Sequence, residues 1–73
     1  MNYNYKEMIE NRVKYAADSY SIVLMYEIYG VLRGLALAGA VDNAYYLEAS
    51  GRICRDYFNN ATWRKECYRR DEI

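Results

Sequence analysis

The sequence lacks several residues that would define a function: it has no proline, no histidine and only two cysteines among 73 residues. Apolar residues make up 53% of the chain, which excludes a disordered or collagen-like polypeptide. Without histidine, a four-ligand zinc site would have to combine Cys54 and Cys67 with carboxylates or with a second chain. We therefore predict no metal site and no cofactor, and we expect both cysteines to be reduced thiols at the core.

An excess of one charge is also missing, because ten acidic residues balance ten basic ones. A net charge of zero removes the strongest sequence argument for a nucleic-acid binder or a membrane-surface peptide. The stretch over residues 20–41 is apolar enough to suggest a membrane span, but Glu27 and Arg33 near its centre make insertion costly. The N-terminal MNYNYKEMIENR has no apolar signal core, so we expect a cytoplasmic protein with no membrane segment.

Catalytic motifs are absent from the sequence. Serine and threonine are few, no glycine-rich phosphate loop follows a strand, and no histidine is available as a base. Cys54 lies close to Arg52 and Arg55, which would favour a thiolate, but its place on an apolar stripe predicts burial instead. We therefore expect a protein that is not an enzyme and that acts by binding.

The length of the chain allows one domain, which we assign to residues 1–73. So short a chain has a small core, and its stability is marginal unless packing is good or a partner helps. Apolar residues recur at helical spacing along the chain. The sequence therefore predicts an all-α fold, a compact bundle of three to four helices.

The first half of the chain is compatible with one helix or with two. Apart from Glu27, apolar and small residues occupy every position of a series with steps of four and three from Ile9 to Leu37, and neither glycine nor proline interrupts the first 29 residues. We favour one long first helix over residues 5–38, with a kink allowed. The alternative is a break within the stretch DSYS, where Asp18 or Ser19 could cap a second helix.

The second half predicts an antiparallel second helix followed by a short C-terminal helix. Gly39 suits the left-handed position after a helix end, and Asp42 is a good N-cap for a helix over residues 43–59. Asn60 or Thr62 can then cap the last helix.

Ion pairs at helical spacing are expected on two of these surfaces. Glu10 and Lys14 form one pair four residues apart, and Glu48, Arg52 and Asp56 form a ladder with the same spacing. Both patterns predict exposed, helix-stabilising contacts within a single helix.

The central apolar stretch predicts a helix with two unlike sides. The side that we expect to face the core carries Leu24, Ile28, Val31, Leu32 and Leu35. The other side carries Gly30 and Gly34, which each cost about 1 kcal/mol relative to alanine in a helix interior. The usual reason for such a pair is the close approach of another backbone, either from this same chain or from a second one.

Aromatic and charged residues surround these two glycines. Ten residues of the chain are tyrosines, more than a small core can hide. Tyr26, Tyr29 and Arg33 join Gly30 and Gly34 on this side, and Tyr29 and Arg33 have the spacing of a cation–π contact. Because this composition is typical of interface hot spots, we predict that these five residues bind a protein, with self-association as one form of that binding.

An alternative site lies in the C-terminal third, where basic and aromatic residues are interleaved. Its basic residues are Arg52, Arg55, Arg64, Lys65, Arg69 and Arg70. Basic and aromatic side chains together suit the phosphates and bases of nucleic acids. Nucleic-acid binding is therefore the second hypothesis, after a protein partner.

In size, in its lack of catalytic motifs and in its tyrosine- and asparagine-rich helical composition, the chain resembles small phage-encoded proteins that block bacterial defence systems, the anti-CRISPR proteins among them. No residue motif defines that class, so no site residue is transferred from it. The resemblance implies a stoichiometric inhibitor that binds a large host enzyme or nucleoprotein complex. We therefore predict a non-enzymatic protein-binding module, with a small nucleic-acid-binding protein as the alternative.

Overall fold

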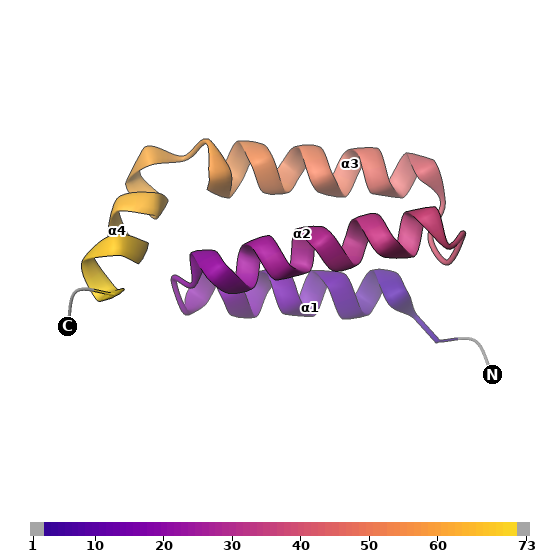
Figure 1. Cartoon of the computed structure of the whole chain (residues 1–73), viewed down its shortest axis with the longest axis horizontal. Helices are drawn as coiled ribbons and strands as arrows, with labels where there is room; N and C mark the ends of the chain where they lie inside the picture. The colour runs from indigo at the N-terminus through magenta and orange to yellow at the C-terminus, as the bar shows by residue number, and fades with distance from the viewer. Residues whose placement is uncertain (1–2, 72–73) are drawn as a thin grey trace.

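The computed structural model describes residues 3–71, which form four α-helices and one short π-helical segment (Figure 1). The elements are α1 Tyr5–Asp18, α2 Ile22–Leu37, α3 Asn43–Ile53, η1 Cys54–Phe58 and α4 Ala61–Asp71. Helices α1, α2 and α3 run antiparallel in succession, and α4 turns across the end of the bundle where α1 ends and α2 begins (Figure 1). The predicted all-α bundle of three to four helices is confirmed. The outermost positions of the predicted domain, residues 1–2 and 72–73, lie outside the described residues.

The predicted long first helix is wrong, because the chain reverses between α1 and α2. The reversal has the hydrogen bonds of a Schellman motif. The Tyr20 amide donates to the Ala17 carbonyl oxygen at 3.2 Å, and the Ser21 amide donates to the Ala16 carbonyl oxygen at 3.1 Å. Tyr20 occupies the left-handed position with a φ of 51°, which is uncommon for a residue with a side chain.

The cap of α2 also differs from the predicted one. Ser21 is the N-cap, and its Oγ accepts a hydrogen bond from the Leu24 amide at 3.2 Å. Asp18 is the last residue of α1, and Ser19 is its C-cap. The predicted break within DSYS was therefore the better of the two alternatives, although the capping residue lies at its end.

Helix α4 supports the unusual backbone of Tyr20. The Tyr20 ring stacks on Trp63 with centroids 6.4 Å apart, and the Arg70 guanidinium lies 4.4 Å from the Tyr20 ring centroid. Trp63 Nε1 donates a hydrogen bond to the Ala17 carbonyl oxygen at 3.2 Å. These contacts fix α4 to the α1–α2 turn and offset the cost of the left-handed conformation.

The second reversal follows the prediction. Gly39 has a φ of 73°, and the amides of Gly39 and Ala40 donate to the carbonyl oxygens of Ala36 and Leu35 at 3.1 and 2.9 Å. Asp42 then caps α3, because its Oδ1 accepts a hydrogen bond from the Tyr45 amide at 2.7 Å. The predicted turn and the predicted N-cap are both confirmed.

The core receives side chains from every α-helix and from the second turn. Its buried residues are Ile9, Val13, Ala16, Ile22, Met25, Ile28, Leu32, Val41, Ala49, Ile53, Trp63 and Cys67. The core side of α2 differs in part from the prediction, because Val31 is exposed and Leu24 and Leu35 are half-buried. Ile22 and Met25 are buried in their place, since α2 packs between α1 and α3 and its buried side must meet both.

A π-helical turn connects α3 to α4. The Asn59 amide donates to the Cys54 carbonyl oxygen, five residues earlier, at 2.7 Å. The turn brings Tyr57 edge-on to Trp63, with ring centroids 5.0 Å apart, and it brings Phe58 against α2. This irregular segment therefore joins the C-terminal helix to the rest of the core.

The last helix begins at the predicted cap. Asn60 Oδ1 accepts a hydrogen bond from the Trp63 amide at 3.1 Å, which selects Asn60 over Thr62. Trp63 and Cys67 lie one turn apart on the buried side of α4.

Candidate functional site

One side of α2 faces solvent along the whole helix. We call it the outer face of α2, and its exposed residues are Val23, Tyr26, Glu27, Gly30, Arg33, Gly34 and Leu37. Their spacing of mainly three and four places them on one side of a helix about 24 Å long. Val23, Tyr26 and Leu37 are large apolar or aromatic residues that are 62%, 55% and 81% exposed. An exposed strip of this kind is a candidate interaction surface.

The two glycines at the middle of this face have open space above them. A Cβ atom added at Gly30 or Gly34 would meet no heavy atom within 4 Å beyond its own helix neighbourhood. The interpretation that this chain's own backbone packs on the glycines is therefore wrong. The other interpretation, a second chain, stays a proposal.

Tyr26 is held in place although more than half of it is exposed. Its ring stacks on Phe58 with centroids 4.4 Å apart and an interplanar angle of 16°. Because the stack already restricts the ring, a partner that contacts Tyr26 causes little further loss of side-chain conformational entropy. Phe58 thus supports the site without belonging to the predicted set.

Tyr29 does not belong to the outer face. Its ring is half-buried against the core and meets Phe58 edge-on, with centroids 5.6 Å apart. The neighbouring Cys54 thiol group, followed by burial, raises the pKa of the Tyr29 hydroxyl. The helix turns by about 300° over the three residues after Tyr26, which carries Tyr29 toward the core. The predicted cation–π contact with Arg33 is absent from the part of the chain that the structure describes.

The outer face also carries two opposite charges. Glu27 and Arg33 lie on either side of Gly30, and both side chains are exposed. Within residues 3–71 neither of them takes part in an ion pair. Their charges are therefore available to a binding partner.

A groove of about 330 Å³ between α1 and α2 adjoins this face. Glu27 lines it together with Arg12 and Tyr15 of α1 and with Leu24 and Val31 of α2. The groove extends the exposed apolar surface from α2 toward α1.

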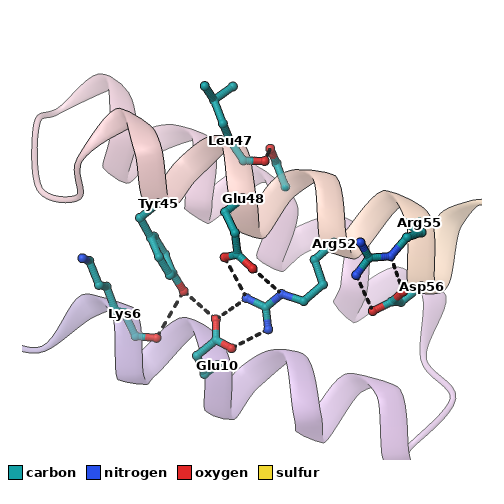
Figure 2. A network of polar contacts seen from close by, with 9 residues as sticks. Lys6, Glu10, Tyr45, Leu47, Glu48, Arg52, Arg55 and Asp56 are labelled. Carbon is teal, nitrogen blue, oxygen red and sulfur yellow. Dashed lines mark hydrogen bonds and ion pairs between the residues drawn. The ribbon is translucent and has the colours of Figure 1, made fainter.

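A second polar group joins α1 to α3 (Figure 2). We call it the α1–α3 polar cluster, and its members are Glu10, Tyr45, Glu48 and Arg52. Arg52 donates from Nη1 to Glu10 Oε1 at 2.6 Å and from Nη2 to Glu10 Oε2 at 2.7 Å. Tyr45 Oη donates to Glu10 Oε2 at 2.6 Å, and Arg52 Nε lies 3.3 Å from Glu48 Oε1. The cluster therefore links α1 to α3, two helices that are not consecutive in the sequence.

Ionisation in this cluster is biased toward the paired state. The Arg52 hydrogen bonds hold the pKa of Glu10 below its usual value. Burial, followed by the hydrogen bond to Glu10, raises the pKa of Tyr45. The Glu10 carboxylate in turn raises the pKa of Arg52. At neutral pH the carboxylate and the guanidinium are charged and the phenol is neutral, which suits the observed bonds.

The ion pairs predicted from spacing within one helix are only partly correct. Lys14 pairs with Asp18 at 3.4 Å and not with Glu10, whose carboxylate is engaged by α3. In the ladder over α3 and η1, Asp56 pairs with its neighbour Arg55 at 2.9 Å, so only the first step of the ladder, between Glu48 and Arg52, forms.

Three of the six basic residues predicted for nucleic acid, one each on α3, η1 and α4, have partners within the chain. Arg52 belongs to the α1–α3 polar cluster, and Arg55 pairs with the adjacent aspartate. Arg64 donates to the Phe58 carbonyl oxygen at 3.2 Å and to the Tyr68 hydroxyl at 2.8 Å. These cations are engaged in contacts within the chain.

The other three lie on α4, as Arg64 also does. Arg69 and Arg70 both bond to Glu66, the latter with Nε 3.3 Å from the carboxylate. Lys65 is exposed and makes no ion pair within the described residues. The six cations are therefore distributed over three elements: one on α3, one on η1 and four on α4.

The remaining chemistry of the chain is sparse. No disulfide joins Cys54 and Cys67, which are half-buried and buried as predicted. Within residues 3–71, no group of three or more cysteine or carboxylate side chains is placed to hold a metal ion. None of the helices described here combines the length and the apolar character needed to cross a lipid bilayer.

Some residues of the outer face were missed by the predicted five-residue site. Val23 and Leu37 share the spacing of the glycines, so helical periodicity places them on this side of α2 although the predicted site leaves them out. The contribution of Phe58 had no such signal, because it depends on the π-helical turn.

Similarity to known proteins gives no further guide to this surface. Comparisons with protein-family models, with curated proteins and with solved structures found no match.

Proposed function

We propose that this protein is a non-enzymatic protein-binding module whose partner contacts the outer face of α2. One observation carries the proposal: the two glycines of this face have open space above them and lie among exposed apolar and charged side chains. Two glycines inside a helix lower its stability, and the close approach of a partner is a physical reason for that cost.

The binding residues proposed here are a revised set. Tyr26, Gly30, Arg33 and Gly34 are retained, because all four are exposed on one side of α2. Tyr29 is assigned to the supporting layer beneath them, since it packs against the core. Aromatic and arginine side chains around a shallow hollow are the usual composition of a hot spot.

A more specific form of the proposal is a phage-encoded stoichiometric inhibitor of a host defence complex. It is supported by the small size of the chain and by a binding surface that carries no catalytic group. Such a protein would act by covering a surface on a larger host enzyme or nucleoprotein complex.

Affinity capture tests the binding role of the outer face. The immobilised wild-type chain should retain a partner from a lysate of the source cells, and Gly34→Leu should lose it because the new side chain fills the hollow. Gly51→Leu is the matched control, because Gly51 is also an exposed helical glycine with open space but lies on α3. Equal retention by wild type and Gly34→Leu, or equal loss by both variants, would contradict the proposal.

Nucleic-acid binding is the second candidate, supported by the exposed cations Lys65, Arg69 and Arg70 on α4. If it is correct, changing these three and Arg64 to glutamine should abolish binding to single- or double-stranded nucleic acid. The wild-type affinity should also fall steeply with added salt, because each neutralised phosphate releases counterions. Measurable wild-type binding at physiological salt that is lost in this variant would favour this candidate over a protein partner.

A further inference from the structure

The outer face of α2 is self-complementary about Gly30. Positions at equal distances before and after Gly30 carry groups that suit each other: opposite charges, an aromatic ring with a glycine hollow, and two aliphatic side chains. These pairs are Glu27 with Arg33, Tyr26 with Gly34, and Val23 with Leu37. The separations of three, four and seven residues keep every member on the same side of the helix.

We propose that the outer face of α2 binds a second copy of this chain, with the two α2 helices antiparallel and Gly30 of each copy at the two-fold axis. This inference rests on the proposed function, because it names the partner of the same face. A two-fold interface uses one surface patch on both subunits, so the patch must be complementary to itself. The symmetric order of residues around Gly30 meets that requirement.

Charge complementarity selects the antiparallel arrangement. Glu27 of one copy meets Arg33 of the other, and the two-fold axis forms this pair twice. Neither residue has an ion-pair partner within residues 3–71 that would have to be displaced. In a parallel arrangement Glu27 would instead face Glu27 of the other copy, and Arg33 would face Arg33. Like charges in contact oppose association.

Shape complementarity follows from the same order of residues. The Tyr26 ring, fixed by its stack on Phe58, reaches the open space above Gly34 of the other copy. Val23 meets Leu37 at both ends of the contact, and these side chains are among the most exposed apolar groups of the chain. Their removal from water drives the association.

The size of the face predicts a weak dimer. A standard protein interface takes about 800 Å² from each partner. One side of a single helix about 24 Å long supplies less than that area. We therefore expect association that depends on concentration, in rapid exchange between monomer and dimer.

Sedimentation equilibrium with charge-reversal variants tests the arrangement. The wild-type mass should rise with concentration from 8.7 kDa toward twice that value. Glu27→Arg alone and Arg33→Glu alone should each weaken self-association at least tenfold, because each places two like-charged pairs in the contact. An equimolar mixture of the two variants should regain the wild-type mass, since both pairs are then opposite in charge. A wild-type chain that stays at 8.7 kDa at every concentration, or a mixture that gains no mass, would overturn the inference.

A steric test separates this inference from the proposed function. Gly34→Leu should remain monomeric, and Gly51→Leu, its control on α3, should associate like wild type; circular dichroism checks that both are folded. If wild type is monomeric while Gly34→Leu still abolishes capture of a different protein, the second copy is excluded and the proposed function stands. If Gly34→Leu changes neither the mass nor the capture, both fail.

Discussion

The α1–α3 polar cluster and the outer face of α2 contain the same three residue types in opposite situations. The cluster combines an arginine, a glutamate and a tyrosine that bond to one another across two helices. The outer face has an arginine and a glutamate without intrachain ion pairs in residues 3–71, beside a tyrosine that is 55% exposed. The comparison teaches that residue type alone does not decide which of these groups are paired within the fold. The packing of the helices decides it, because α1 and α3 bring the cluster residues together.

Burial reinforces this difference. The Arg52 and Glu10 side chains are 30% and 41% exposed, so their two parallel hydrogen bonds are partly shielded from water. Paired charges with bidentate geometry are stronger than single surface contacts. The cluster therefore contributes to folding, whereas the charges of Glu27 and Arg33 form no ion pair within residues 3–71.

The largest expected change in the free energy of unfolding comes from a comparison of the two tyrosines of α2. Tyr29→Ala should lower the free energy of unfolding by about 2–3 kcal/mol, because it removes a half-buried ring from the core. Tyr26→Ala should lower it by about 1 kcal/mol through loss of the Phe58 stack, and should weaken partner binding more than folding. Urea denaturation of both variants measures these values. Equal losses would mean that Tyr26 is a structural residue.

A somewhat smaller effect distinguishes the two arginines. Arg52→Met should lower the free energy of unfolding by about 1–2 kcal/mol, because Glu10 loses both hydrogen bonds from the guanidinium. Arg33→Met, the matched control on the outer face, should change it by less than about 0.5 kcal/mol. Chemical denaturation at neutral pH gives both numbers. A similar cost for the two variants would remove the distinction between the two regions.

The glycine substitutions should act in the stabilising direction. In dilute solution Gly34→Ala and Gly51→Ala should each raise the free energy of unfolding by about 0.5–1 kcal/mol, since both positions are helical with open space. Thermal denaturation at low protein concentration measures the change. A loss of stability in Gly34→Ala alone would show that something within the chain packs on Gly34 after all.

The smallest effect is the dependence of stability on pH. Arg52 lowers the pKa of Glu10 in the folded state, so the resulting stability is present above the unfolded pKa and is lost as pH falls through the folded one. Acidification from neutral pH to below the usual carboxyl value of 4.5 should therefore destabilise wild type more than Arg52→Met. Urea titrations of both proteins along a pH series measure this difference. Parallel curves would show that the Glu10 pair contributes nothing.

The two turns show what the sequence can and cannot reveal about the fold. Both are Schellman motifs with a residue at positive φ, but Gly39 occupies that position in one and Tyr20 in the other. Glycine is the expected residue there, so the second turn was predicted. Tyr20 is held by Trp63 and Arg70 from a distant helix, and no local pattern carries that information. For this reason the long first helix was predicted in error.

The same division between local and distant contacts applies to the candidate site. Helical spacing correctly placed Gly30, Gly34 and Arg33 on one side of α2, because periodicity is a local property. It could not show whether another helix covers the glycines, since that depends on where α3 and α4 pack. The pairing of Glu10 failed likewise, because an arginine 42 residues later displaces the local partner Lys14.

The amide spectrum of the four glycines tests most directly whether the outer face of α2 binds a second copy of this chain. In a two-dimensional ¹H–¹⁵N spectrum of the labelled wild-type chain recorded over a range of concentrations, the signals of Gly30 and Gly34 should shift progressively. Those of Gly39 and Gly51, which lie outside the outer face, should stay in place. Stationary signals of Gly30 and Gly34 at every concentration, or a shift confined to Gly51, would contradict self-association through this face.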